Sequence, residues 1–238
     1  MSNSPLVSYI KISPNKTSPR NHSIDTITIH CLVGQCSVET IGDIFSKKSY
    51  KASSNYGIGP DGRIGMYVEE KDRSWCSSNS ANDNRAITIE CASDTKHPYA
   101  INDEVYNSLI DLCVDICKRN NIKELKWKAD KTLVGKPSKQ NITVHRWFAN
   151  KACPGDYIYT RLGRIASEVN DRLNSDTRVP FAVRVDIDDL NYRTKPSLDG
   201  SIKGQTGKGV FTIVEVSNGW GLLKSGAGWI NLNYATKL

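Results

Sequence analysis

The sequence has no long apolar run. None of its stretches approaches the about 18 apolar residues that a membrane-spanning helix needs, so we expect no stable insertion into a membrane. The start, MSNSPLVSYIK, lacks the basic segment and apolar core of a secretory signal, which favours synthesis in the cytoplasm without export by the general route. Hydrophobic residues make up 38% of the 238 positions, enough for a buried core. We therefore expect a soluble globular protein.

Paired Cys-x-x-Cys clusters of the kind that hold structural zinc are also absent, although the chain has seven cysteines. Because seven is odd, at least one thiol is unpaired or binds something else. Cys113 and Cys117 lie one helical turn apart among apolar residues, which predicts two thiols in a core. Without an export signal, disulfides are not the default for the others. These are Cys31, Cys36, Cys76, Cys91 and Cys153.

A basic cluster is missing as well. Lysine and arginine number 32 against 25 aspartates and glutamates, a net charge of +7 that favours an anionic partner. Nucleic acid, a membrane surface and an acidic wall polymer all fit that charge. Since the basic residues are spread along the chain and no nucleic-acid-binding motif is present, we expect no nucleic-acid partner.

Strand and helix patterns alternate over about the first 173 residues, which predicts an α/β fold. Ser37 and Asn102 are expected to cap helices, and Asp61-Gly62 is a typical hairpin turn. Strands are predicted at 24–32, 86–91 and 142–145, a hairpin at 55–68, and helices at 37–48, 103–119 and 156–173. Beyond NSDTRVP, residues 181–238 contain only short strand-like runs between turn residues. We therefore predict two domains, 1–175 and a small all-β domain at 176–238.

Three segments of the first domain share one pattern and carry a residue that can bind metal or move a proton. ITIHC contains His30, ITIEC contains Glu90, and ITVH ends on His145. Because side chains alternate along a strand, these residues lie on its more polar face, at the carboxyl end. If the strands are adjacent and parallel, that end of the sheet is where an α/β fold binds ligands. The pattern predicts one site built from three strands.

Two imidazoles and a thiolate, from His30, His145 and Cys153, suit zinc and leave a fourth position open to water, as in a catalytic site. Glu90 is then placed to act as base, which predicts hydrolysis of an amide or ester. Lys151 lies two residues before the cysteine, where a cation can reach the oxyanion. A nucleophilic pair of Cys153 and His145 is an alternative, but it leaves His30 and Glu90 without a role.

The segments TITIHC, SSNYGIGPDGRI, AITIEC and VHRWFANKACPGD together resemble the zinc-dependent N-acetylmuramoyl-L-alanine amidases of the type 2 amidase and peptidoglycan-recognition superfamily, especially phage endolysins. The resemblance covers about residues 20 to 170. It implies a mixed central β-sheet flanked by helices, with Zn²⁺ held by His30, His145 and Cys153. The implied reaction cuts the bond between the lactyl group of N-acetylmuramic acid and the L-alanine of the stem peptide.

Carried over by position, the resemblance implies that Glu90 is the general base and Lys151 stabilises the oxyanion. It makes Tyr56 the active-site tyrosine. Trp75 opens WCSSN where relatives often read Trp-His-Ala-Gly, so it is a candidate for substrate binding, with Cys76 in place of the histidine. Superfamily members that only bind peptidoglycan have lost the cysteine ligand. The presence of Cys153 therefore favours catalysis, with a non-catalytic peptidoglycan-binding protein as the alternative.

The tail, LNYRTKPSLDG to the end, is similar to bacterial SH3-type cell-wall-binding domains and implies a small SH3-like barrel. The implied partner of the whole chain is the peptidoglycan of a Gram-positive cell wall. The two resemblances together indicate an endolysin, made in the host cytoplasm without a signal peptide, that acts on the wall after release. A host autolysin of the same chemistry fits as well. The sequence carries no signal for an oligomeric state.

Overall fold

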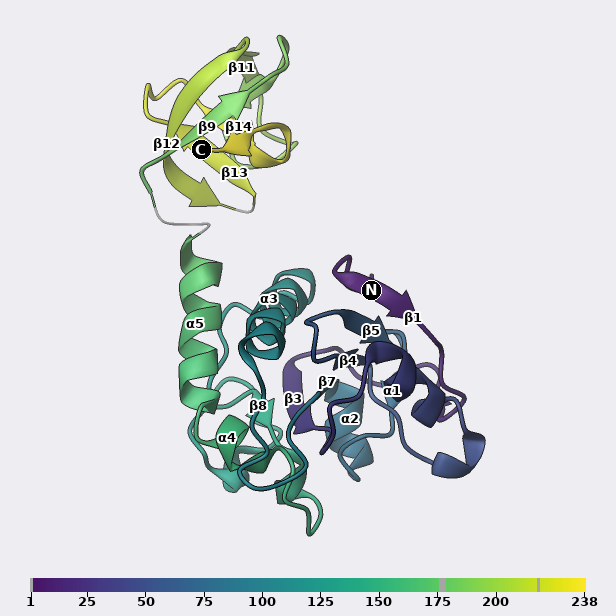
Figure 1. Cartoon of the computed structure of the whole chain (residues 1–238). Coiled ribbons are helices and arrows are strands. Elements are labelled where there is room, and N and C mark those ends of the chain that lie inside the picture. The colour runs from purple at the N-terminus through teal and green to yellow at the C-terminus, as the bar shows by residue number, and fades with distance from the viewer. Residues whose placement is uncertain (1, 176–178, 218) are drawn as a thin grey trace. The chain divides into compact units, whose positions relative to one another are not determined.

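The computed structural model describes residues 2–175, 179–217 and 219–238, and it divides into two units, Met1–Leu173 and Asn174–Leu238 (Figure 1). Each unit has a hydrophobic core of its own, so each is described by itself. The predicted boundary follows residue 175, and residues 176–178, which begin the predicted second domain, lie outside the described residues.

The first unit is built on a six-stranded sheet with the order β1-β5-β4-β7-β3-β8. β4 and β5 pair antiparallel, as the predicted hairpin requires, and the other neighbours pair parallel. The predicted mixed sheet is therefore confirmed. The strands are β1 Val7–Ile10, β3 Thr26–Cys31, β4 Tyr56–Ile58, β5 Ile64–Met66, β7 Ala86–Cys91 and β8 Ile142–Thr143, and a separate pair joins β2 Lys16–Thr17 to β6 Arg73–Ser74.

Helices cover both faces of this sheet. α3 and α5 share one core with the isoleucines of β3 and β7, whereas α1 packs over the hairpin on the other face, where Gly57 leaves room for the Tyr67 ring. The predicted caps are confirmed, because Ser37 accepts from Thr40 N and Asn102 from Val105 N. The helices are α1 Val38–Phe45, α2 Ser80–Arg85, α3 Asp103–Arg119, α4 Gly155–Tyr159 and α5 Leu162–Ser175, with short 3-10 turns η1 Lys48–Tyr50, η2 Lys131–Leu133 and η3 His145–Trp147.

The predicted single helix over 156–173 is wrong in one respect, because it is two helices, α4 and α5. The Thr160 hydroxyl donates to the carbonyl of Asp156 at 2.7 Å, and Arg161 N donates to Ile158 O at 2.9 Å. Both contacts tighten the last turn of α4, and a side chain that bonds back to the carbonyl four residues earlier competes with regular helix. The apolar stripe continues across the break, which is why periodicity alone did not reveal it.

The predicted polar face of the central strands is also buried. Every residue of β3 is buried, including Thr28 and His30, and the Thr28 and Thr143 hydroxyls lie 2.7 Å apart. A strand covered on both sides needs partners for its polar side chains, and here the hydroxyls supply them to one another. Cys113 and Cys117 are fully buried in α3, which confirms their prediction as core thiols, and all seven cysteines are free of disulfides.

The second unit is all β, as predicted. Seven strands pair antiparallel in the order β11-β10-β14-β13-β12-β9-β15 around a small core that includes Val183, Ile213 and Ile230. Its elements are β9 Phe181–Val185, β10 Asn191–Arg193, β11 Ile202–Gln205, β12 Gly209–Ser217, β13 Trp220–Leu223, β14 Trp229–Asn231, β15 Thr236–Lys237 and the 3-10 turn η4 Leu232–Tyr234.

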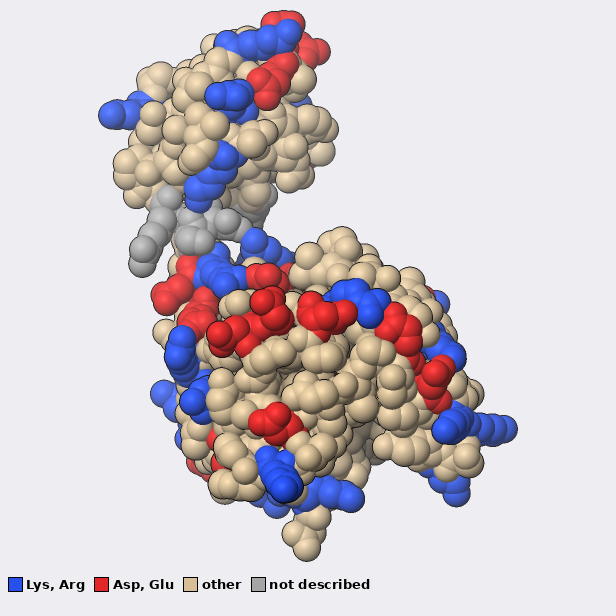
Figure 2. All heavy atoms as spheres, viewed as in Figure 1, with Lys and Arg blue, Asp and Glu red and all other residues tan. Residues whose placement is uncertain are grey.

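The surface carries mixed charge. The face drawn in Figure 2 shows both basic and acidic side chains, with acidic ones gathered in a band across the first unit. Within the described parts of the chain, no helix combines the length and the apolar character needed to cross a membrane.

Candidate functional site

The strands of the predicted site are adjacent and parallel, with β3 between β7 and β8. His30 of β3 lies directly opposite Glu90 of β7 in the register, and both stand one residue before the end of their strands. The condition for a site at the carboxyl edge of the sheet is therefore met. His145 differs from the prediction, since β8 ends at Thr143 and the histidine begins η3.

Two histidines and a cysteine meet at this edge. The His30 and His145 rings are 5.2 Å apart between centroids, and Cys153 Sγ lies 3.3 Å from His30 Nδ1. One ligand atom from each of the three residues lies within 4.8 Å of the others. The loop that carries the cysteine is fixed by Arg146, which bonds to the Ala152 carbonyl and the Asp156 carboxylate.

The three side chains fit zinc by their chemistry. Burial, with a smaller effect from His145, lowers the pKa of His30 to about 3, so its imidazole is neutral and free to act as a ligand. His30 Nε2 is buried without a hydrogen-bond partner among the described residues. Burial raises the pKa of the Cys153 thiol, so a bound cation is what would hold it as thiolate. Two nitrogens and one sulfur form a donor set typical of zinc.

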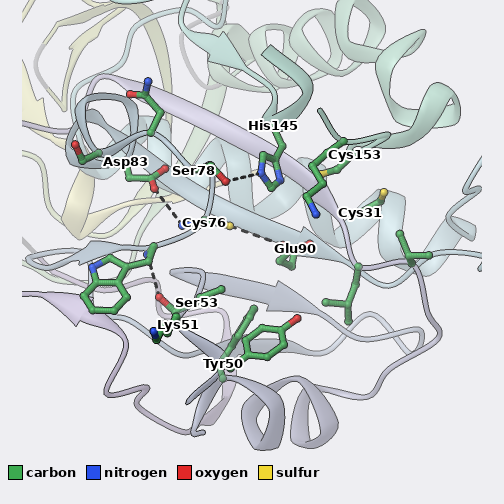
Figure 3. A pocket seen from close by; sticks show the side chains of 18 of the residues that line it. Cys31, Tyr50, Lys51, Ser53, Cys76, Ser78, Asp83, Glu90, His145 and Cys153 are labelled. Carbon is green, nitrogen blue, oxygen red and sulfur yellow. Dashed lines mark hydrogen bonds between the residues drawn. The ribbon is translucent and has the colours of Figure 1, made fainter. Parts of the chain in front are cut away.

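Glu90 lies beside this cluster. Its Oε1 is 3.9 Å from His30 Nδ1, and its Oε2 has no hydrogen-bond partner in the described chain. The same Oε1 lies 3.7 Å from Cys76 Sγ (Figure 3). Burial, followed by the nearby Cys31 thiol, raises the pKa of Glu90 to about 8. A carboxyl group with such a pKa can both accept and return a proton near neutral pH.

A pocket of about 610 Å³ opens over these residues. It brings together Glu90, His145 and Cys153 with the exposed Lys151 and the half-buried Trp75, and His30 lies behind it in contact with the cysteine. The positive charge of Lys151 acts on His145, where it adds to burial in lowering the imidazole pKa. Six of the seven predicted site residues are thus at or against one pocket.

Tyr56 is the exception, because the structure does not bring it to this pocket. In β4 it pairs with Ile89, whereas its neighbour Gly57 pairs with Glu90, so the tyrosine points to the opposite face of the sheet. Tyr56 is fully buried there, and its hydroxyl donates to Glu70 Oε1 at 2.7 Å. Its position in the sequence placed Tyr56 correctly on a strand, but not on the face of the sheet that it occupies. The tyrosine that lines the pocket is Tyr50.

Sequence reasoning missed Ser78. Its hydroxyl lies 3.1 Å from His145 Nε2, and its backbone has a φ of 62°, which is uncommon for a residue with a Cβ. Asp83 holds the preceding turn, because it accepts from Ser77 Oγ at 2.6 Å and from Cys76 N at 3.0 Å. The one sequence signal was Asn79, the cap of the short helix α2, which has too few apolar residues to be recognised.

A second, smaller pocket lies in the second unit. It measures about 280 Å³ and has Trp220 and Tyr234 among its lining residues. Leu198, which also lines it, is 74% exposed, and Tyr234 is 60% exposed. An exposed aromatic and aliphatic surface around a pocket is a typical ligand-binding feature.

Comparisons with known proteins concern mainly the first unit. A family model described as N-acetylmuramoyl-L-alanine amidase matches residues 20–156. The Staphylococcus aureus hydrolase AmiA, solved in complex with its ligand, is 14% identical with a TM-score of 0.52, covering 71% of this chain and 83% of that one. The catalytic domain of XlyA is 13% identical with a TM-score of 0.50, covering 68% and 97%. At these identities the two structures show a shared fold. No curated protein sequence matches the chain.

Proposed function

Because the chain belongs to the N-acetylmuramoyl-L-alanine amidase family, whose model matches more than half of it, we propose that the pocket at His30 and Glu90 cleaves peptidoglycan with bound zinc. The bond cut is the amide between N-acetylmuramic acid and the L-alanine of the stem peptide. The observation that carries the proposal is the convergence of two histidines, a cysteine and a carboxyl group on one pocket.

His30, His145 and Cys153 would hold Zn²⁺, which supplies a polarised carbonyl and a water whose pKa falls toward about 7. Glu90 takes the proton from the attacking water and returns it to the nitrogen of the leaving L-alanine. Lys151, exposed on the pocket wall beside His145, stabilises the oxyanion.

The products of wall digestion test this reaction. The proposal predicts new amino termini on L-alanine without new reducing sugars, measured by amine labelling, a reducing-end assay and mass spectrometry of the soluble fragments. A non-catalytic peptidoglycan-binding protein releases neither. An autolysin of the host gives the same products as an endolysin, so this experiment tests the chemistry and not the origin.

A thiol peptidase built on Cys153 and His145 predicts new amino termini at an internal bond of the stem. It also predicts that His30→Ala keeps activity, because His30 has no role in such a pair. In the zinc mechanism His30→Ala loses both the metal and hydrolysis. Alkylation of Cys153 does not separate the two mechanisms, since it destroys either site.

We extend the proposal to the second unit, as an SH3-type cell-wall-binding domain that tethers the enzyme to its insoluble substrate. Tethering raises the local concentration of the catalytic unit. The exposed Tyr234 at the pocket of about 280 Å³ supports this role. In the full chain, Tyr234→Ser is expected to weaken sedimentation with Gram-positive walls while thermal stability is kept. Unchanged sedimentation with every wall tried would remove the support that this pocket gives to a targeting role.

A further inference from the structure

The charge on the open wall of the catalytic pocket is positive. Three cations line the pocket, Lys51, Arg73 and Lys151, against the two carboxyl groups of Asp83 and Glu90. Asp83 is 2% exposed and is occupied by donors from Cys76 and Ser77. Asp83 is buried and the Glu90 side chain is only 14% exposed, whereas Lys51 and Lys151 are exposed, so a substrate entering the pocket meets lysines first.

These cations lie in two different parts of the pocket. Lys151 acts on His145 and belongs to the reacting end. Lys51 lies across the pocket from His145 and Cys153, with Glu90 between (Figure 3). It is exposed, and its ammonium group has no partner among the described residues. The oxyanion needs one cation, so Lys51 is free to contact another part of the substrate.

The backbone that carries Lys51 is held against the segment of Arg73. Lys51 directly follows η1 and is in the left-handed conformation, with a φ of 53°. Two residues later Ser53 N donates to the Trp75 carbonyl at 3.0 Å, and Trp75 N donates to Ser53 Oγ at 3.1 Å. The two cations therefore stand on two segments that are tied to each other.

Arg73 is fixed by Thr17 of β2. Its Nη2 donates to Thr17 Oγ1 at 2.6 Å, and Trp75 Nε1 donates to the same oxygen at 2.9 Å. Within the described chain this is the only hydrogen bond of the guanidinium, so its other N–H groups have no protein acceptor, and Arg73 lines the pocket. A planar, partly fixed guanidinium is the group best matched to a carboxylate.

We propose that Lys51 and Arg73 form a subsite for a free carboxylate of the stem peptide, with Trp75 beside it. This inference rests on the proposed function, with L-alanine at Glu90 and Lys151, and it assigns the next stem residue to the side of the pocket lined by Lys51 and Arg73. That residue is joined through its side-chain carboxyl group, so its α-carboxyl group is either free or amidated. The subsite selects the free form, because an amide brings no charge and adds donors that face cations.

The test compares two soluble substrates, N-acetylmuramoyl-L-alanyl-D-isoglutamate and its isoglutamine amide. Wild-type protein is expected to favour the acid by roughly tenfold or more in kcat/KM, mainly through KM, as expected for a hydrogen-bonded charge. Lys51→Met and Arg73→Gln should each reduce that ratio, and the double variant should bring it near one. Lys48→Met, an exposed lysine three residues earlier that does not line the pocket, is the matched control and keeps the wild-type ratio.

Equal turnover of the two compounds by the wild type, or a wild-type ratio in the double variant, overturns the subsite. Calorimetric binding of both compounds to the Glu90→Gln protein distinguishes a failure of the subsite proposal from a failure of the proposed function. A binding preference that the double variant abolishes supports the subsite even if no compound is hydrolysed, and equal binding refutes it. If inorganic phosphate displaces the acid compound more readily than acetate does, and the double variant loses that difference, the subsite is one for wall phosphate and the carboxylate assignment is wrong.

Discussion

Tyr56→Phe separates a structural tyrosine from a catalytic one. The hydroxyl of Tyr56 donates to Glu70 Oε1 at 2.7 Å and accepts from Ser4 N at 2.9 Å. Phenylalanine fills the same fully buried space, so the substitution removes these two hydrogen bonds and little else. Glu70 keeps its contacts with Arg119 and Asn120, so its carboxylate is not left unpaired.

The expected loss of stability follows from those contacts. A hydrogen bond to a charged group contributes about 1.5–3 kcal/mol, and the buried Ser4 N–H loses its acceptor. We expect a loss of about 2–4 kcal/mol in the free energy of unfolding of the first unit. For a unit of this size each kcal/mol lowers the midpoint by about 2–4 °C, so the midpoint should fall by about 4–16 °C.

Thermal unfolding, monitored by circular dichroism, gives the midpoint temperature. Wall hydrolysis assayed well below that temperature measures function. The account predicts a lower midpoint with hydrolysis close to wild type. Tyr50→Phe is the matched control, because Tyr50 is 52% exposed and should shift the midpoint far less. An unchanged midpoint together with a loss of hydrolysis of about a hundredfold would refute the structural assignment, since that is the effect of removing a catalytic donor.

Two further substitutions probe the pocket itself. Glu90→Gln should keep bound zinc and lower hydrolysis by about 10²–10⁴-fold, the usual contribution of general acid–base catalysis; metal lost in parallel with activity would instead make Glu90 a ligand. Ser78→Gly removes the hydroxyl that contacts His145 Nε2 while suiting a φ of 62°. It should weaken zinc binding by about tenfold or more in a competition titration, as loss of a group that orients a ligand does, and unchanged affinity would show that the contact is incidental.

The strands of the site were predictable because their information is local. ITIHC and ITIEC are rich in β-branched residues, alternate in polarity, and pair in register so that His30 lies opposite Glu90. The capping residues Ser37 and Asn102 were predictable for the same reason. What the pattern could not give was the depth of burial. Whether a threonine on β3 faces water or another strand's hydroxyl depends on residues more than a hundred positions away.

The remaining differences between the predicted and the observed site come from tertiary contacts. Tyr56 was assigned to the site by its position in a motif, but the pairing of β4 with β7 decides which of its residues face Glu90. Lys51 and Arg73 line one pocket although they are far apart in the chain, and bonds between Ser53 and Trp75, 22 positions apart, join their segments. Ser78 reaches His145 through a turn held by Asp83, a helix residue in a segment without apolar periodicity.

Metal content and hydrolysis, measured on the same sample before and after metal removal, test the central claim most directly. The account predicts about one zinc per chain, no release of L-alanine amino termini once the zinc is stripped, and recovery when zinc is returned. Wall hydrolysis that persists in thoroughly metal-free protein would contradict it.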